Sequence, residues 1–158
     1  MTTLTNGLTV NAGISAMANW LAALNSESSY TYDGTEFTLG LPIPHTPVDP
    51  METTNTQLTI TAASGTQFTG SKTFRYERLQ LGSTRAGAGQ NYSLTNGQTQ
   101  DSMVAQILAD HNLIPAEIVV EGNIPGTPGG TAVWTLTAIN NSLIYYGQMG
   151  VTVHLPVF

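Results

Sequence analysis

The sequence predicts an α+β fold of mainly antiparallel sheets with two helices. Two stretches place apolar residues at helical spacing, and several others alternate apolar and polar residues as β-strands do. The order of helix, strand, proline- or glycine-rich connection and hairpin also occurs twice along the 158 residues. We therefore expect an N-terminal arm or short strand, residues 1–13, and a single domain, 14–158, with an internal duplication of a helix–strand–hairpin unit.

The first helix is predicted over about residues 15–25. Ser15 is a suitable N-cap, because its hydroxyl can accept a hydrogen bond from the first free backbone N–H groups. The apolar stripe at helical spacing consists of Ile14, Met17, Leu21 and Leu24.

A strand, an extended connection and a hairpin follow this helix. Alternation with period 2 predicts the strand over 37–41. The connection 42–56 contains four prolines, which remove backbone donors and favour an extended chain. Alternation on both sides of Ser64-Gly65 predicts a β-hairpin over 57–81.

The second half repeats this order after a glycine-rich loop, residues 82–100. A helix is expected to begin near Asp101, whose carboxylate suits the positive end of the helix dipole. The strands expected after it cover 117–121, 132–139 and 148–157.

The two predicted pseudo-repeats cover about 14–81 and 101–158. The matching segments are Leu58–Ala62 with Trp134–Ala138 and, after one inserted residue, Phe74 and Tyr76 with Val151 and Val153. Chance similarity between alternating strands with glycine turns is the alternative interpretation.

Composition excludes several classes of protein. Four Lys and Arg residues and a net charge of −6 are too few positive charges for a nucleic-acid binder. No apolar run is long enough for a transmembrane helix, and the N-terminus lacks the features of a signal peptide. Only 9% of residues are charged, against a typical figure of about 25%, which suits either a neutral soluble surface or surfaces that neighbours cover.

The sequence contains no recognisable catalytic, cofactor-binding or metal-binding motif. There are no cysteines, and His45, His111 and His154 lack the spacing of a zinc site. Nucleophile-elbow, P-loop and dinucleotide-binding patterns are also missing. We therefore expect no enzyme activity, no cofactor and no small-molecule substrate.

All of the basic residues lie within 14 positions of one another, and they are Lys72, Arg75, Arg78 and Arg85. One interpretation is a basic ridge that contacts an acidic surface of a neighbouring subunit, because Arg is favoured in such interfaces. The other is pairing with acidic residues along and across the strands.

Short motifs in the hairpin and near the C-terminus resemble a family of structural virion proteins of large-genome tailed bacteriophages. The residues that carry the resemblance are Phe68-Thr69-Gly70-Ser71, Arg78-Leu79-Gln80-Leu81, Asn112-Leu113 and Ser142-Leu143-Ile144-Tyr145-Tyr146-Gly147. The resemblance covers about residues 55–158.

This resemblance implies a non-enzymatic structural subunit of a phage particle. It would decorate or assemble on the capsid, neck or tail, in contact with other virion proteins and with copies of itself. It would be made in the bacterial cytoplasm and be located in the virion. The alternative is a glycan- or receptor-binding module on the virion surface, with sugars stacked on Tyr30, Tyr32, Tyr92, Tyr145 and Tyr146.

Overall fold

The structure, a computed structural model that describes residues 1–82 and 90–157, confirms the α+β class. The chain divides into two compact units. The first unit comprises Met1–Val10, Ile14–Leu79 and Asn141–Ile144, and the second comprises the other described residues. Sequence analysis expected a single domain, whereas each unit contains its own helix and its own sheet.

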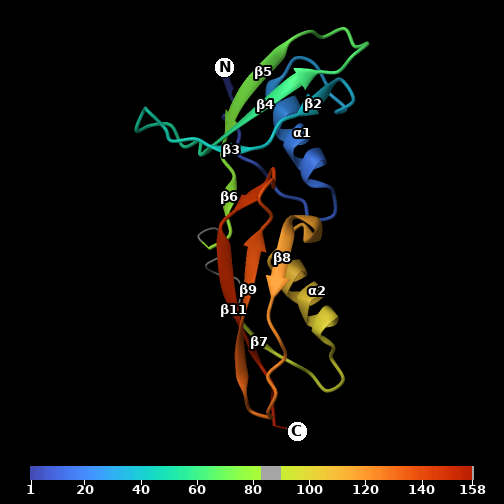
Figure 1. Ribbon diagram of the computed structural model, residues 1–158, viewed down its shortest axis with the longest axis vertical. Helices are drawn as coiled ribbons and strands as arrows, with labels where there is room; N and C mark the ends of the chain where they lie inside the picture. Colours follow the sequence, from blue (N-terminus) through green and yellow to red (C-terminus); the bar gives the residue numbers. More distant parts are fainter. Residues whose placement is uncertain (83–89, 158) are drawn as a thin grey trace. The chain divides into compact units, whose positions relative to one another are not determined.

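The first unit is one sheet with one helix packed against it (Figure 1). Its elements are β1 (Thr2–Thr3), α1 (Ala16–Glu27), β2 (Phe37–Leu39), β3 (Ile43–Pro44), β4 (Thr56–Ala62) and β5 (Ser71–Tyr76). The strand order is β1-β5-β4-β2, and β3 also pairs with β4. The β1 strand is parallel to β5, and every other pair in this sheet is antiparallel.

The second unit has the same arrangement (Figure 1). Its elements are β7 (Asn91–Ser93), α2 (Gln100–Asp110), a 3₁₀ turn (Pro115–Glu117), β8 (Ile118–Glu121), β9 (Thr131–Ala138) and β11 (Gln148–His154). The strand order is β7-β11-β9-β8, with β7 parallel to β11 and the other pairs antiparallel. Outside the two sheets, β6 (Leu79–Gln80) pairs with β10 (Tyr145–Tyr146).

The strand registers of the two units correspond position by position. The equivalent cross-strand pairs are Leu58–Phe74 with Trp134–Val151, Thr56–Tyr76 with Ala132–Val153, and Phe37–Ala62 with Ile118–Ala138. The segments that sequence analysis matched therefore occupy the same places in two sheets of the same topology.

The sequence predicts a loop over 82–100, but the described part of this range contains a strand, and residues 83–89 lie outside the described residues. Asn91–Ser93 forms β7, in which the buried Tyr92 lies between two exposed neighbours. A three-residue strand is too short for its alternation to be recognised in the sequence. The segment 1–13 likewise contributes the two-residue strand β1, so each repeat begins with a strand before its helix.

Both helices begin at a capping side chain. The Ser15 hydroxyl accepts from the Ala18 N–H at 3.1 Å, which confirms the predicted N-cap of α1. Thr99 and Ser102 form a reciprocal capping box at the start of α2. These caps satisfy backbone donors that the first turn of a helix leaves free.

An aromatic cluster holds α1 against its sheet. Trp20 is fully buried, and its ring centroid lies 6.2 Å from that of Phe37, 5.9 Å from Phe74 and 6.3 Å from Tyr76, all edge-on. Edge-on aromatic pairs stabilise by about 0.5–1.5 kcal/mol beyond the burial of their area. The cluster therefore sets the position of the helix over β2 and β5.

The second unit packs around Trp134, which occupies the position equivalent to Leu58. The Trp134 indole N–H donates to the Asn123 carbonyl at 2.9 Å. Its ring also lies directly against Gly122, where a Cβ would stand 2.3 Å from ring atoms Cγ and Cδ1.

We predict that Gly122→Ala lowers the free energy of unfolding by about 1–3 kcal/mol, because the added methyl group displaces the buried Trp134 ring. Urea denaturation followed by tryptophan fluorescence measures the loss. Gly126→Ala is the matched control, since a Cβ there meets nothing within 4 Å and the change should stay within about 0.5 kcal/mol. Equal losses for the two variants would contradict this account of the core.

Candidate functional site

The predicted basic ridge does not form, because Arg78 is buried within the first unit. Its Nε donates to Thr56 Oγ1 at 2.8 Å and its Nη1 to the Ser142 carbonyl at 3.1 Å. The Asn55 side chain brackets the Arg78 backbone, accepting from its N–H and donating to its carbonyl, both at 2.9 Å. Arg78 is therefore buried in hydrogen bonds within its own unit, where the sequence predicts an exposed side chain on a basic ridge.

Arg75 fastens the proline-rich connection to the sheet. Its Nη1 lies 3.4 Å from Glu52 Oε1, and the same carboxylate lies 3.1 Å from His45 Nε2 and accepts from the Thr54 hydroxyl. His45 Nδ1 is in turn 2.9 Å from Gln57 Nε2 on β4. Arg75 thus follows the alternative interpretation, pairing with an acidic residue, although its partner lies in the connection.

Lys72 is the exposed member of the three basic residues in the described part of the chain. Its ammonium lies over the Phe74 ring, 5.1 Å from the ring centroid. Arg85, the fourth predicted contact residue, lies outside the described residues. The predicted set is therefore divided between a buried, a paired and an exposed side chain.

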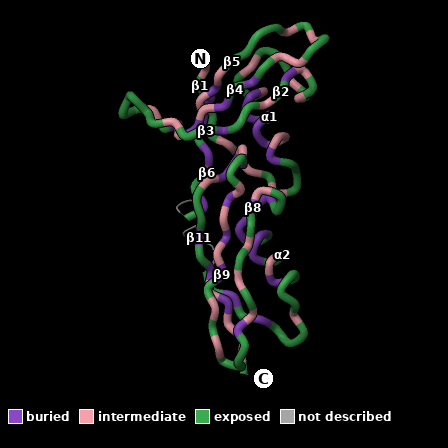
Figure 2. Tube along the Cα trace, viewed as in Figure 1, coloured by how far each residue is buried: buried purple, intermediate pink, exposed green. Residues whose placement is uncertain are grey.

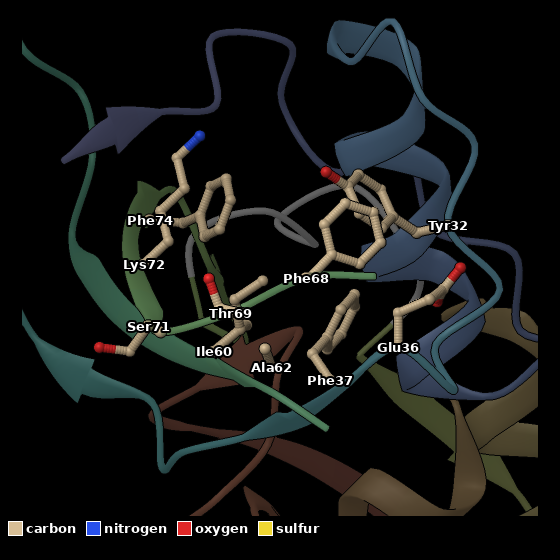
Figure 3. A pocket seen from close by; sticks show the side chains of 11 residues that line it. Tyr32, Glu36, Phe37, Ile60, Ala62, Phe68, Thr69, Ser71, Lys72 and Phe74 are labelled. Carbon is tan, nitrogen blue, oxygen red and sulfur yellow. The ribbon is translucent and has the colours of Figure 1, made fainter. Parts of the chain in front are cut away.

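Lys72 stands at the edge of a pocket of about 290 Å³ in the first unit (Figure 3). Four aromatic rings line it, from Tyr32, Phe37, Phe68 and Phe74, and Ile60 and Ala62 of β4 add aliphatic surface. Thr69, Gly70, Ser71 and Glu36 complete the lining. The pocket offers a mainly apolar interior with one cation and one carboxylate beside it.

Hydrogen bonds to the backbone hold the loop that carries Tyr32. The Asn25 side chain accepts from the Tyr32 N–H and donates to the Tyr32 carbonyl, both at 2.8 Å. The Glu36 carboxylate accepts from the Gly34 N–H at 3.0 Å and from the Asp33 N–H at 3.3 Å. This wall of the pocket is therefore formed before any ligand arrives.

Aromatic contacts hold the turn between β4 and β5 against the same loop. The Phe68 ring lies 5.7 Å from that of Tyr32 and 5.2 Å from that of Tyr30. Sequence analysis treated Phe68 as part of a turn motif and Tyr32 as a possible sugar-stacking residue, and did not bring them together. The signal was the concentration of aromatic residues in 30–37 and 68–76.

The second exposed feature is the segment between β3 and β4, residues 45–55. It is called the arm from here on and is distinct from the N-terminal segment 1–13. It extends away from the sheet of its own unit (Figure 1), and its outer part is exposed (Figure 2). Val48 and Met51 are 89% and 86% exposed, although both are apolar. The Asp49 carbonyl accepts from the Glu52 N–H at 2.9 Å and the Asp49 carboxylate from the Met51 N–H at 2.8 Å, which makes the tip an ordered turn.

Two of the five tyrosines proposed for sugar stacking belong to the core of the second unit. Tyr145 is fully buried, and its hydroxyl accepts from the Ile114 N–H at 3.3 Å. Tyr92 is also buried, and burial, with a further contribution from Asp110, raises the pKa of its hydroxyl. Tyr30 and Tyr32 keep exposed surface beside the pocket.

Side chains that can bind a metal ion are dispersed over the described residues, 1–82 and 90–157. No group of three or more His, Asp or Glu side chains there is arranged to hold a metal ion. None of the helices in that part of the chain has the length and apolar character needed to cross a membrane.

These features define a small α+β protein with two topologically equivalent units, an aromatic pocket and an apolar arm. The chain belongs to a family of unknown function (DUF7941), whose family model matches residues 13–157. Comparisons with curated proteins and with solved structures give no match.

We predict that Arg78→Ala lowers the free energy of unfolding by about 2–4 kcal/mol, because it leaves the buried Thr56 hydroxyl and Ser142 carbonyl without their charged donor. Urea denaturation measures the loss. Lys72→Ala is the control, and it should cost at most about 1 kcal/mol, since the side chain is exposed and contacts one ring face. A loss as small for Arg78 as for Lys72 would show that Arg78 is not a structural residue.

Stability should depend on pH through Glu52. The Thr54 hydroxyl, together with His45 and Arg75, holds the pKa of this carboxyl below its ordinary value of 4.5. A lowered folded-state pKa means that the carboxylate stabilises the fold above pH 4.5 and that this contribution is lost as the pH falls through the folded-state pKa.

Wild type should therefore be more stable than Glu52→Gln near neutral pH, and the difference should shrink on acidification. Urea denaturation at pH values from about 7 to about 3 measures it. Thr54→Val, which removes the main donor, should reproduce part of the effect. A constant difference across this range would show that the pKa is not lowered.

Proposed function

We propose that the protein is a non-enzymatic structural subunit of a tailed phage particle that decorates or assembles on the capsid, neck or tail through protein–protein contacts. The observation that carries the proposal is the concentration of exposed apolar side chains on and beside the arm. Leu41, Ile43, Val48 and Met51 are between 53% and 89% exposed. Exposed apolar residues that gather in one place mark surfaces that bind another molecule.

The order of the arm supports the same proposal. The Glu52–Arg75 ion pair, the His45–Gln57 contact and the bond from the His45 N–H to the Asn55 carbonyl at 2.8 Å hold the base of the arm on the sheet. An ordered segment loses little conformational entropy when it binds, so it can present apolar side chains to a neighbouring subunit at low cost.

The assignment to a phage particle rests on the sequence resemblance. Phe68-Thr69-Gly70-Ser71 forms part of the pocket lining, whereas Arg78 and Leu81 of the second motif are buried. The resemblance therefore concerns residues that build the fold and the pocket, and the arm adds the surface for assembly. The expected partners are other virion proteins and copies of the same chain.

A glycan- or receptor-binding module is the second candidate function. The observation that favours it is the pocket with Tyr32 and Phe68 at its wall, since sugars stack on aromatic faces. Burial of Tyr92 and Tyr145 removes two of the rings on which that function would depend.

The test is to purify particles of a phage that encodes the chain and to count its copies by quantitative mass spectrometry. We predict that the double variant Val48→Asp, Met51→Asp falls by at least about tenfold in copies per particle, because charged residues replace apolar contacts that are central to the interface. Val133→Asp is the matched control, since Val133 is also an exposed valine (70%) but lies on β9.

Two results would contradict the proposal. One is that purified particles contain no copies of the wild-type chain. The other is equal incorporation of the arm variant, the control and the wild type, which would show that the arm does not contact the particle.

A further inference from the structure

We propose that the tip of the arm in one copy of the chain docks into the aromatic pocket of a second copy, so that the protein self-associates head to tail. This inference rests on the proposed structural function and names one partner of the arm. The tip is defined as residues 47–51, with Val48 and Met51 exposed on either side of Asp49.

The tip and the pocket lie at opposite ends of one strand. The arm joins β4 at Thr56, and the pocket is lined by Ala62, the last residue of the same strand. At about 3.3 Å per residue these ends are roughly 20 Å apart. The contacts of Glu52 with Arg75 and of His45 with Gln57 hold the base of the arm at its own end. The tip that fills a pocket therefore comes from another copy.

The size and lining of the pocket suit aliphatic side chains. Its volume of about 290 Å³ lies at the lower limit of small-molecule sites, which span about 300–1,000 Å³. The rings of Phe37, Phe68 and Phe74 offer apolar and sulfur–aromatic contacts to a methionine such as Met51. Val48 adds a second apolar group on the same turn.

The charges of the two surfaces are complementary. The tip carries the exposed carboxylate of Asp49, and the pocket edge carries the exposed ammonium of Lys72. The Glu36 carboxylate also lines the pocket, but it accepts hydrogen bonds from the Asp33 and Gly34 N–H groups. The chain as a whole has a net charge of −6, so two copies repel each other unless an acidic surface meets a basic one. Lys72 is the exposed basic side chain within residues 1–82 and 90–157, and it lines the pocket, so it is the cation there that can attract Asp49.

Both surfaces are ordered before they meet. The Asp49–Glu52 turn, with Pro50 at its second position, fixes the tip, and Pro47 lies two residues before it. The Asn25 bonds to the Tyr32 backbone fix the pocket wall. Such preorganisation limits the entropy lost on docking, which matters because the contact is small and the expected affinity is weak.

The contact joins two different surfaces, so after two copies pair, one of them keeps a free pocket and the other keeps a free tip. A heterologous contact of this kind closes into a ring or continues as a filament, according to the rotation between neighbours. Repeated assembly is the behaviour expected of a structural subunit that is present in many copies.

The test uses two full-length variants that each lose one side of the contact. The tip variant is Val48→Asp with Met51→Asp, and the pocket variant is Ala62→Phe, which fills the cavity. Sedimentation velocity should show wild type associating as its concentration rises, and each variant alone should have a dissociation constant at least about tenfold higher. An equimolar mixture of the two should form a one-to-one dimer and nothing larger, because only one competent tip and one competent pocket remain.

A second pocket variant protects the test from misfolding. Lys72→Glu changes an exposed charge at the edge of the pocket, and it should weaken association, whereas Lys72→Arg, which keeps the charge, should associate as wild type does. Val133→Asp is the control and should associate as wild type does.

Three results would overturn self-docking: a wild-type chain that remains monomeric up to about 1 mM, a tip variant that associates as wild type does, and two variants that do not complement each other. Glycan-array binding that Phe68→Ser abolishes, without a change in sedimentation, would assign the pocket to a sugar instead. A monomeric chain that still enters particles through its arm would overturn self-docking and leave the proposed function standing. Self-association of a chain that has no copies in particles would overturn the proposed function and leave self-docking standing.

Discussion

The antiparallel pairing of β4 with β5 is the constraint on which the first unit depends. Its register places Leu58 opposite Phe74, and the Phe74 ring lies edge-on to Trp20 of α1. Because side chains alternate along a strand, the same pairing points Arg75 toward the arm. The arm leaves at one end of the hairpin and the pocket lies at the other, so a single ladder separates the two exposed features.

Much of the fold could be predicted from local patterns, because helical spacing, period-2 alternation and a capping serine each act within a few residues. The match of Leu58–Ala62 with Trp134–Ala138 was visible for the same reason. The strand β7 was missed, and β1 was predicted only as one of two alternatives for residues 1–13, because strands of two or three residues carry no readable period and pair with a strand that is distant in the sequence. The burial of Arg78 could not be predicted, because its hydrogen-bond partners Thr56 and Ser142 lie 22 and 64 positions away in the sequence.

The candidate site was less predictable than the fold. Its residues come from the loop after α1, from β2 and from the β4–β5 hairpin. The Asn25 bonds hold Tyr32 of the loop on α1, and the Tyr32 ring lies against the rings of Phe37 and Phe68. Lys72, Arg75 and Arg78 are close in the sequence but have different surroundings in the structure. The aromatic residues of the pocket are distant in the sequence and lie together in the structure. A charge cluster along a strand is divided between its two faces, so parity decides which charges can act together.

The central claim, that the arm of one copy occupies the pocket of another, is tested most directly by site-specific cross-linking. The chain has no cysteine, so Met51→Cys and Thr69→Cys, placed in separate preparations, carry one thiol each, and Thr69 lines the pocket. A disulfide forms only if the two Cβ atoms approach to about 3.5–4.5 Å. On mild oxidation the account predicts a cross-linked dimer of the two variants, formed at least about tenfold faster than that of Met51→Cys with Val133→Cys. Equal rates for both mixtures would contradict it.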